Sequence, residues 1–451
     1  MPPTPAHRQR ARRRVAPHLA CSLIACTAFT AALAATPALR PSPSLPPPAH
    51  HDELPQVDDL ATLVDMAWAR SPQARQLEGQ GLEARTQADS ARGWFPGAPS
   101  VTVGQRTGER PGQRALREQE VALAAPLWSP RQRAASQQAA DSSQAAVDAA
   151  TRTLRLELTR QVRERIDALS LGGLMVRQAQ SHAEALARLE AEVRQRVAAG
   201  DLARVDALLV RQEALAALSE VRRARLALLE AEHAFHVLVG EVRPAPQAAR
   251  MGLPDPSRLS DADLQRLLET AHEVVAAHPR LRAAEAARQQ QAHRVSWLAQ
   301  SSRSPWELGL AHRREQDGDA RRTNASWGLS LKVPLADEPL QRQTLAVAQT
   351  AADVAAAEVR RTHDVLVSDL LEAVQAVRHQ RALLADARES TEAAQARADL
   401  IRRAHALGEV SLAERLRAEQ ALQAATLRVT QQDMLLAQAQ ARLQFAQGAQ
   451  P

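Results

Sequence analysis

The sequence predicts a mostly α-helical protein with a small β part, built as a tandem repeat. Two stretches, Ala198–Gln212 and Ala406–Gln420, match at an offset of 208 residues, and landmarks over most of each half keep that spacing. A run of 68 residues without Gly or Pro, Leu340–Leu407, predicts a helix about 100 Å long. Segments with alternating apolar and polar residues occur at matching places in both halves and predict strands.

The N-terminus has the pattern of an export signal. Five arginines and no acidic residue precede the apolar run LACSLIACTAFTAAL, which is too short to span a bilayer as a helix. Residues 1–35 are expected to be a signal peptide cleaved after the small residues Ala32–Ala35. The sequence Leu23–Cys26 resembles a lipobox, which leaves lipidation of Cys26 open. Both cysteines lie in this region, so the remaining chain is expected to contain no disulfide.

Hydropathy limits the possible locations of the protein, and its charge and motifs exclude several functions. No later segment reaches 18 consecutive apolar residues, so the exported part is expected in the periplasm, outside the cell, or in an outer membrane as a β-barrel. The formal charge of +6 falls to +1 without residues 1–35, and no basic patch with interleaved aromatics remains, which argues against nucleic-acid binding. Motifs of phosphate loops, zinc proteases and serine hydrolases do not occur, so no enzyme activity or cofactor is expected.

The first repeat is expected over residues 58–243, after a proline-rich linker at 36–57. Its predicted elements are a helix broken at Ser71-Pro72, strands at about 100–106 and 117–127, and helices at about 131–199 and 201–239 that meet at Gly200.

The second repeat is expected over residues 261–448, after a linker at 244–260. Its predicted elements are a helix broken at His278-Pro279, strands at about 306–313 and 325–335, the helix Leu340–Leu407, and a return helix of about 39 residues after a turn at Gly408. The stripe on the long helix comprises Leu366, Leu370, Val374, Val377 and Leu384.

Four strands in one chain pose a problem for a membrane location. Open strand edges cannot face lipid, and membrane barrels have at least eight strands, so several chains would have to close one barrel together. Trp94, Trp128, Trp306 and Trp327 lie in or beside the strands. Both interfacial aromatics and tryptophans that pack a hairpin against a helix would occupy such places.

Together these features resemble the TolC-type outer-membrane efflux proteins. The resemblance covers about residues 55–448 and rests on the repeat, the strand pairs and the pattern Gly-x5-acid-x-Leu-x3-Gln that begins at Gly200 and Gly408. It implies a homotrimer in which three chains form a 12-stranded β-barrel in outer-membrane lipid and an α-helical barrel in the periplasm. It also implies two partners at the periplasmic mouth, an adaptor (membrane fusion) protein and an inner-membrane pump of the RND type.

The function that the resemblance implies is a passive export duct. The spellings AAGDLAR and LGEVSLAE are similar to those of the subgroup that works with cobalt–zinc–cadmium pumps, and multidrug channels use neighbouring spellings. Heavy-metal cations are therefore one candidate cargo. The alternative is a periplasmic adaptor or a structural coiled-coil protein of an export complex, although adaptors normally carry one hairpin in a larger β-rich body.

The hairpin tips hold the candidate functional residues. Gly200 and Gly408 suit the left-handed conformation that ends a helix. The acidic residues at the tips would form a ring that gates the mouth or selects cations, or would only suit the helix dipole: Asp201, Asp206, Glu409 and Glu414. Arg196 resembles the Arg-x3-Gly motif that contacts adaptors, whereas the second half has Ala404 at the matching place.

Two histidine groups invite a metal interpretation that the sequence does not support. His233 and His236 are spaced by three residues on a predicted helix, and His50–Glu53 reads HHDE in a proline-rich segment. Zinc sites normally use three or four convergent protein ligands, so no metal site is expected at either place.

Overall fold

The computed structural model describes residues 54–110, 113–245, 259–301, 304–316, 323–335 and 339–449. The expected signal peptide, Cys26, most of the 36–57 linker and most of the 244–260 linker lie outside these residues. Among the helices within them, none combines the length and the hydrophobicity that crossing a bilayer requires.

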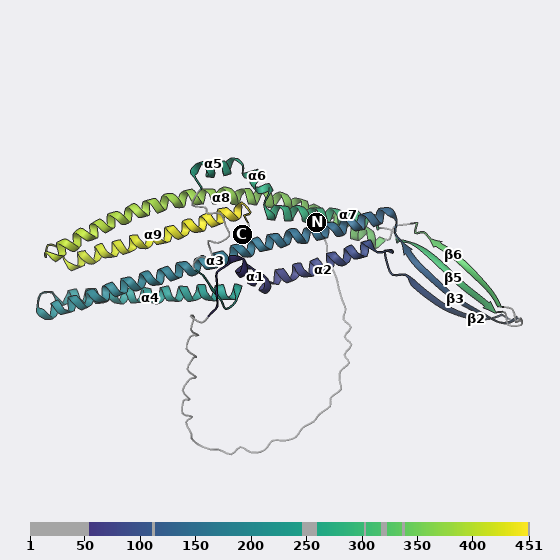
Figure 1. Cartoon of the computed structure of the whole chain (residues 1–451), viewed down its shortest axis with the longest axis horizontal. Helices are drawn as coiled ribbons and strands as arrows, with labels where there is room; N and C mark the ends of the chain where they lie inside the picture. The colour runs from purple at the N-terminus through teal and green to yellow at the C-terminus, as the bar shows by residue number, and fades with distance from the viewer. Residues whose placement is uncertain are drawn as a thin grey trace, which may run out of the picture. The chain divides into compact units, whose positions relative to one another are not determined.

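Helices make up most of the described chain, and strands from both halves form one larger sheet (Figure 1). The helices are α1 (Leu60–Arg70), α2 (Pro72–Arg92), α3 (Pro130–Ala199), α4 (Arg204–Val239), α5 (Asp261–Glu269), α6 (Ala271–Ala276), α7 (Pro279–Gln300), α8 (Pro339–Ala406) and α9 (Leu412–Ala446). The strands are β1 (Gln56–Val57), β2 (Ser100–Arg110), β3 (Gln113–Leu127), β4 (Arg243–Pro244), β5 (Trp306–Gln316) and β6 (Thr323–Lys332).

Two long helices organise the helical part. The 70 residues of α3 and the 68 residues of α8 correspond to about 100 Å each. Each folds back on a shorter helix, so that α3 pairs with α4 and α8 pairs with α9, while α7 packs against both α3 and α8 (Figure 1). The long helix predicted at 340–407 is confirmed within one residue. The helix expected from Asp201 is wrong at its start, because residues 201–203 form the connecting loop and α4 begins at Arg204.

The sheet has the strand order β2-β3-β5-β6, and all neighbours are antiparallel (Figure 1). The two halves of the sequence therefore meet in the sheet through β3 and β5. The strands β2, β3 and β5 extend beyond the predicted bounds, as β5 does to Gln316. The strand predicted at about 325–335 is shifted, because β6 begins at Thr323 and ends at Lys332. The additional residues of β2, β3 and β5 are mostly charged or polar, so they lack the alternation of apolar and polar residues that predicted the strands. Hydrogen bonds between backbones do not require that alternation, and the strands therefore continue into polar sequence.

Each half of the chain has its own hydrophobic core. The first core joins α1, α3 and α4, with Leu63, Val162 and Phe235 fully buried. The second joins α5, α6, α7, α8 and α9 and includes Leu370 and Leu443. The five residues of the predicted stripe on α8 are at most 5% exposed, which confirms that this face packs inward.

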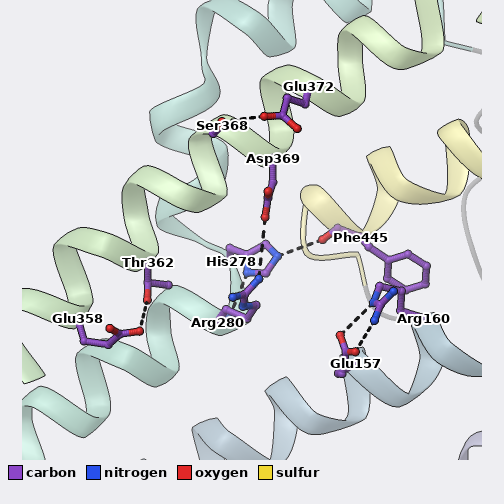
Figure 2. A network of polar contacts seen from close by, with 10 residues as sticks. All are labelled: Glu157, Arg160, His278, Arg280, Glu358, Thr362, Ser368, Asp369, Glu372 and Phe445. Carbon is purple, nitrogen blue, oxygen red and sulfur yellow. Dashed lines mark hydrogen bonds and ion pairs between the residues drawn. The ribbon is translucent and has the colours of Figure 1, made fainter.

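A buried histidine joins the end of α9 to the start of α7 (Figure 2). Nδ1 of His278 accepts the backbone N–H of Arg280 at 3.1 Å, so His278 caps α7. The neutral ring then carries its proton on Nε2, which donates to the carbonyl of Phe445 at 3.0 Å. That carbonyl belongs to the last turn of α9 and also accepts the backbone N–H of Gly448 at 3.0 Å. The His278 side chain therefore hydrogen-bonds to the ends of two helices.

The same junction explains why a glycine follows α9. Gly448 has a φ of +73°, and a Cβ at this position would lie 2.7 Å from Cδ of Pro279. Any larger residue would therefore be strained in its backbone and would also push α7 away from α9.

The stability of this junction is expected to depend on pH. Burial lowers the pKa of His278, and the hydrogen bond to Phe445 offsets only part of that effect. The unfolded chain therefore binds the proton at a higher pH than the folded protein. The contribution of His278 to the free energy of unfolding is complete above about pH 6.5 and is lost as the pH falls through the lowered folded-state pKa.

His278→Gln keeps a donor for Phe445 but cannot take up a proton. We expect this variant to show a smaller fall in the free energy of unfolding between about pH 7 and pH 5 than the unaltered protein, measured by urea denaturation at each pH. His233→Gln, at an exposed position of α4, is the control and should retain the original pH dependence. An unchanged pH dependence in His278→Gln would show that protonation of His278 does not cause the loss of stability at low pH.

Candidate functional site at the tips of the helical hairpins

The first hairpin turns at Gly200, which has φ +88° and ψ 1°. Its N–H donates to the carbonyl of Val197 at 3.1 Å, and the N–H of Asp201 donates to the carbonyl of Arg196 at 2.9 Å. These two bonds form the Schellman arrangement, which satisfies carbonyls at the end of α3. The left-handed conformation predicted for this glycine is confirmed.

The second hairpin turns in the same way. Gly408 has a φ of +81°, its N–H donates to the carbonyl of His405 at 3.0 Å, and the N–H of Glu409 donates to the carbonyl of Ala404 at 2.9 Å. A Cβ added at Gly200 or at Gly408 would meet nothing within 4 Å. The backbone conformation, rather than a lack of space, therefore selects glycine at both tips.

The helices that leave the two tips begin differently. At the second tip, Oγ of Ser411 accepts the backbone N–H of Glu414 at 3.2 Å and caps α9. At the first tip Ala203 occupies the corresponding place, and α4 has no side-chain cap. Asp206 and Glu414 nevertheless lie at equivalent positions in the first turn, where a negative charge interacts favourably with the helix dipole.

This difference predicts opposite effects of two substitutions. Ser411→Ala is expected to lower the free energy of unfolding by about 1 kcal/mol, and Ala203→Ser is expected to raise it by up to a similar amount. Urea denaturation followed by circular dichroism measures both effects. Ser219→Ala, at an exposed position inside α4, is the control for loss of a hydroxyl. Equal stability of Ser411→Ala and the unaltered protein would show that this cap contributes nothing.

The carboxylates at the tips have no charged or hydrogen-bonding side chain as a partner in the described part of the chain. Asp201, Glu409 and Glu414 are exposed and Asp206 is partly buried. Within the described residues, none of the four carboxylates forms an ion pair or accepts a hydrogen bond from a side chain. Each tip thus presents two carboxylates to its surroundings, as cation attraction requires. Interaction with the helix dipole fits Asp206 and Glu414, which lie in the first turns of α4 and α9.

Arg196 lies in the last turn of α3, and its guanidinium is exposed. It forms an ion pair with Glu192 across one helical turn, with Nε and Oε1 3.8 Å apart. An exposed ion pair of this kind contributes little stability, so the guanidinium can exchange Glu192 for an acidic group on another molecule at small cost.

An apolar seam brings the two hairpins together near their tips. Leu412 and Leu416 of α9 are buried in a cluster whose other members lie on α3 and α4, among them Val193 and Val210. The return helices also share a polar contact, in which Nε2 of Gln420 donates to Oε2 of Glu213 at 2.6 Å.

Sequence reasoning identified the tip residues but missed this seam. Gln420 belongs to the pattern that defined the tips, yet its partner Glu213 lies 207 residues away in sequence. His405 was also missed, although its Nδ1 lies 3.1 Å from the carbonyl oxygen of Val410 and closes the second turn. The sequence offered one sign of this role, since His405 takes the place that Val197 occupies in the first repeat.

The sheet has one apolar and one polar face. Along the apolar face Leu310 lies between Leu123 and Leu329 on neighbouring strands, and all three side chains are 44% to 77% exposed. Trp306 and Trp327 are exposed near the two ends of this apolar band, six residues apart in the strand register, because Trp327 pairs with His312.

The remaining tryptophans beside the strands differ in their surroundings. Nε1 of Trp128 donates to the carbonyl of Gly93 at 3.0 Å, so this tryptophan packs the hairpin against the end of α2. Trp94 is 90% exposed.

The polar face carries ion pairs between strands. Nε of Arg313 lies 2.6 Å from Oε1 of Glu118 and 2.8 Å from Oε1 of Glu315. Nζ of Lys332 lies 3.3 Å from Oε2 of Glu307. Charged groups thus gather on the face opposite the exposed leucines and valines.

Known structures share this arrangement. CusC, which forms a transmembrane channel, matches with a TM-score of 0.68 at 16% identity, over 87% of this chain and 93% of CusC. The fold is that of outer-membrane channels. The outer membrane protein VceC of Vibrio cholerae matches this channel fold with a TM-score of 0.66 at 14% identity (86% of this chain, 96% of VceC), and the CmeC channel of Campylobacter jejuni with 0.65 at 14% (86% and 85%).

Similarity of sequence alone does not assign this chain to a known family. No family model matches the chain, and no curated protein does. At identities of 14% to 16% these structures establish only the architecture, because proteins that share a fold can differ in function.

Proposed function

We propose that the protein is the outer-membrane channel of a tripartite efflux system, a passive duct that receives its cargo from an inner-membrane pump of the RND type through a periplasmic adaptor. The two-faced sheet carries this proposal. Its exposed leucines, valines and tryptophans would be costly in water and suit lipid, whereas the ion pairs of the opposite face suit a water-filled interior.

Three copies of the chain would complete the structure. The outer strands β2 and β6 each have one sheet neighbour in the described chain, and unpaired strand edges are not tolerated in lipid. A homotrimer would join β2 of one copy to β6 of the next and close twelve strands into a barrel. The strands of 10 to 15 residues are long enough to cross a bilayer when tilted. The long hairpins would form an α-helical barrel in the periplasm.

The tips would form the periplasmic mouth. Arg196 and Gly200 at the first tip are the proposed adaptor contact, and the four exposed or partly exposed carboxylates of each chain would line the opening. A negatively lined mouth favours cations, which is compatible with heavy-metal ions as cargo. The specificity of export would remain with the pump.

Fractionation and size measurement test the channel proposal. The mature protein is expected in outer membranes as a trimer, in a particle about 140 Å long, from a helix of about 100 Å and a bilayer of about 40 Å. A soluble periplasmic monomer would overturn it and favour the adaptor or coiled-coil alternative. A deletion strain tested against zinc, cadmium, cobalt, nickel, copper and antibiotics then identifies the cargo, since selective loss of metal tolerance would support the heavy-metal proposal.

Removing the acidic charges tests the gate. Combining Asp206→Asn with Glu414→Gln is expected to lower the preference for cations in single-channel recordings and to leave assembly intact. The effect should be larger in dilute salt, because the Debye length is about 10 Å at 0.1 M and about 3 Å at 1 M. Glu230→Gln combined with Glu389→Gln, on the same hairpins away from the tips, is the control. Unchanged ion preference and gating would contradict an acidic ring.

A further inference from the structure

Two histidines form a contact between α6 and α8, which pack against each other away from the tips (Figure 1). Nδ1 of His272 lies 3.3 Å from Nε2 of His363. The ring planes are 18° from parallel, with centroids 5.2 Å apart. The other nitrogen of His363, Nδ1, lies 3.2 Å from Oδ1 of Asp364. A carboxylate and two imidazoles thus follow one another in a row.

The carboxylate determines which nitrogen of His363 is available. An ionised Asp364 can only accept a hydrogen bond, so the neutral His363 ring carries its proton on Nδ1. Its Nε2 then presents a lone pair toward His272. Imidazoles that bind metals in proteins have this arrangement, with the second nitrogen donating to a carboxylate that fixes the ring and increases its basicity.

The spacing of the two imidazoles also suits a chelate. Two nitrogens bound to a tetrahedral ion with metal–nitrogen bonds of about 2.0–2.1 Å lie about 3.3 Å apart, and the two histidine nitrogens are 3.3 Å apart. The ring of His272 is exposed and can turn about its last torsion angle so that its lone pair converges with that of His363. For this, the proton of His272 moves from Nδ1 to Nε2.

We propose that His272 and His363 bind one late first-row divalent ion, of the Ni²⁺, Cu²⁺ and Zn²⁺ class, with Asp364 as the positioning group. Imidazole ligands favour these ions, and Cu²⁺ is expected to bind most tightly. The described residues contain no group of three or more His, Cys, Asp or Glu side chains that could hold a metal ion. The two histidines would therefore be the protein ligands, and water would occupy the remaining positions around the ion. The bound ion replaces a hydrogen bond by two coordinate bonds and links α6 to α8.

This site is independent of the proposed channel function. It lies on helices rather than on the sheet or the tips, and it differs from the two histidine groups that the sequence singles out. The α4 pair His233 and His236 lies on one helix, where His236 is in edge contact with the ring of Phe235, with centroids 6.1 Å apart. That pair provides a matched control within the same chain.

Metal binding to the purified mature protein tests the proposal. All variants carry His50→Ala and His51→Ala, which removes the HHDE segment as a competing ligand. After treatment with EDTA, Cu²⁺ is titrated by calorimetry, and the bound ion is examined by electron paramagnetic resonance. One ion per chain is expected, with hyperfine structure from two imidazole nitrogens. His233→Ala combined with His236→Ala should not change either result.

Three variants decide the outcome. His272→Ala and His363→Ala should each abolish the two-nitrogen signal and the one-per-chain stoichiometry, and Asp364→Asn should weaken binding by roughly 10- to 100-fold. Circular dichroism checks that each variant is folded, and the exposed position of His272 makes its variant the least disruptive. Undiminished binding in His272→Ala, or no Cu²⁺ binding by the unaltered pair, would overturn the proposal.

Discussion

Leu310→Lys is expected to reduce the amount of folded protein in outer membranes by roughly 30-fold or more, because a lysine on the lipid face near the bilayer midplane costs about 2–4 kcal/mol. Leu310 lies at the centre of the apolar face of the sheet, paired with Leu123 and Leu329, and is 44% exposed. Its side chain would contact lipid in the proposed trimer. Quantifying the trimer in isolated outer membranes measures the effect.

The next residue along β5 provides the control. Ala311 pairs with Ala122 and Gly328 and lies on the polar face, because successive side chains of a strand point to opposite faces. Ala311→Lys introduces the same charge one position away and should leave the trimer at close to its normal amount. Equal losses in the two variants would contradict a lipid-facing and a water-facing side of the sheet.

Phe235→Ala is expected to lower the free energy of unfolding by about 3–5 kcal/mol. Phe235 is 0% exposed and packs in the first core, where α4 meets α1 and α3. Removing the ring leaves a cavity that the packed helices α1, α3 and α4 cannot readily close. Urea denaturation monitored by circular dichroism measures the loss.

Leu226→Ala is the control for this substitution. Leu226 lies on the same helix but is 57% exposed, so its truncation should change the stability of the isolated chain by no more than about 0.5 kcal/mol. A loss at Leu226 as large as that at Phe235 would contradict a stabilising effect that depends on burial of the Phe235 ring.

Much of the helical architecture was predictable because local signals decide it. The absence of Gly and Pro located α8, and the prolines Pro72 and Pro279 located the starts of α2 and α7. The glycines at the tips were recognisable since only a left-handed residue can reverse the chain there. Strand ends were less predictable, because hydrogen bonds between backbones extend β2 and β3 into polar sequence.

Contacts between distant segments could not be predicted. The double role of His278 depends on Phe445, 167 residues away, and the sequence showed only a break before a proline. The pairing of His272 with His363 spans 91 residues. Periodicity shows which face of a helix is buried, but it does not show which other segment covers that face, so the cross-hairpin contacts became visible only in the structure.

The separation of the two main cores has a consequence for the order of folding. The first core draws all its residues from 57–245, and the second draws all of its residues from 259–446. Domains of a large chain generally fold as units, the N-terminal one first. The first half can therefore collapse around Phe235 while the second is still being synthesised. The pairing of β3 with β5 and the insertion of Leu412 into the seam require both halves. Until the second half arrives, β3 has an unpaired edge. At this stage the β2–β3 hairpin could pair wrongly with another copy of the chain.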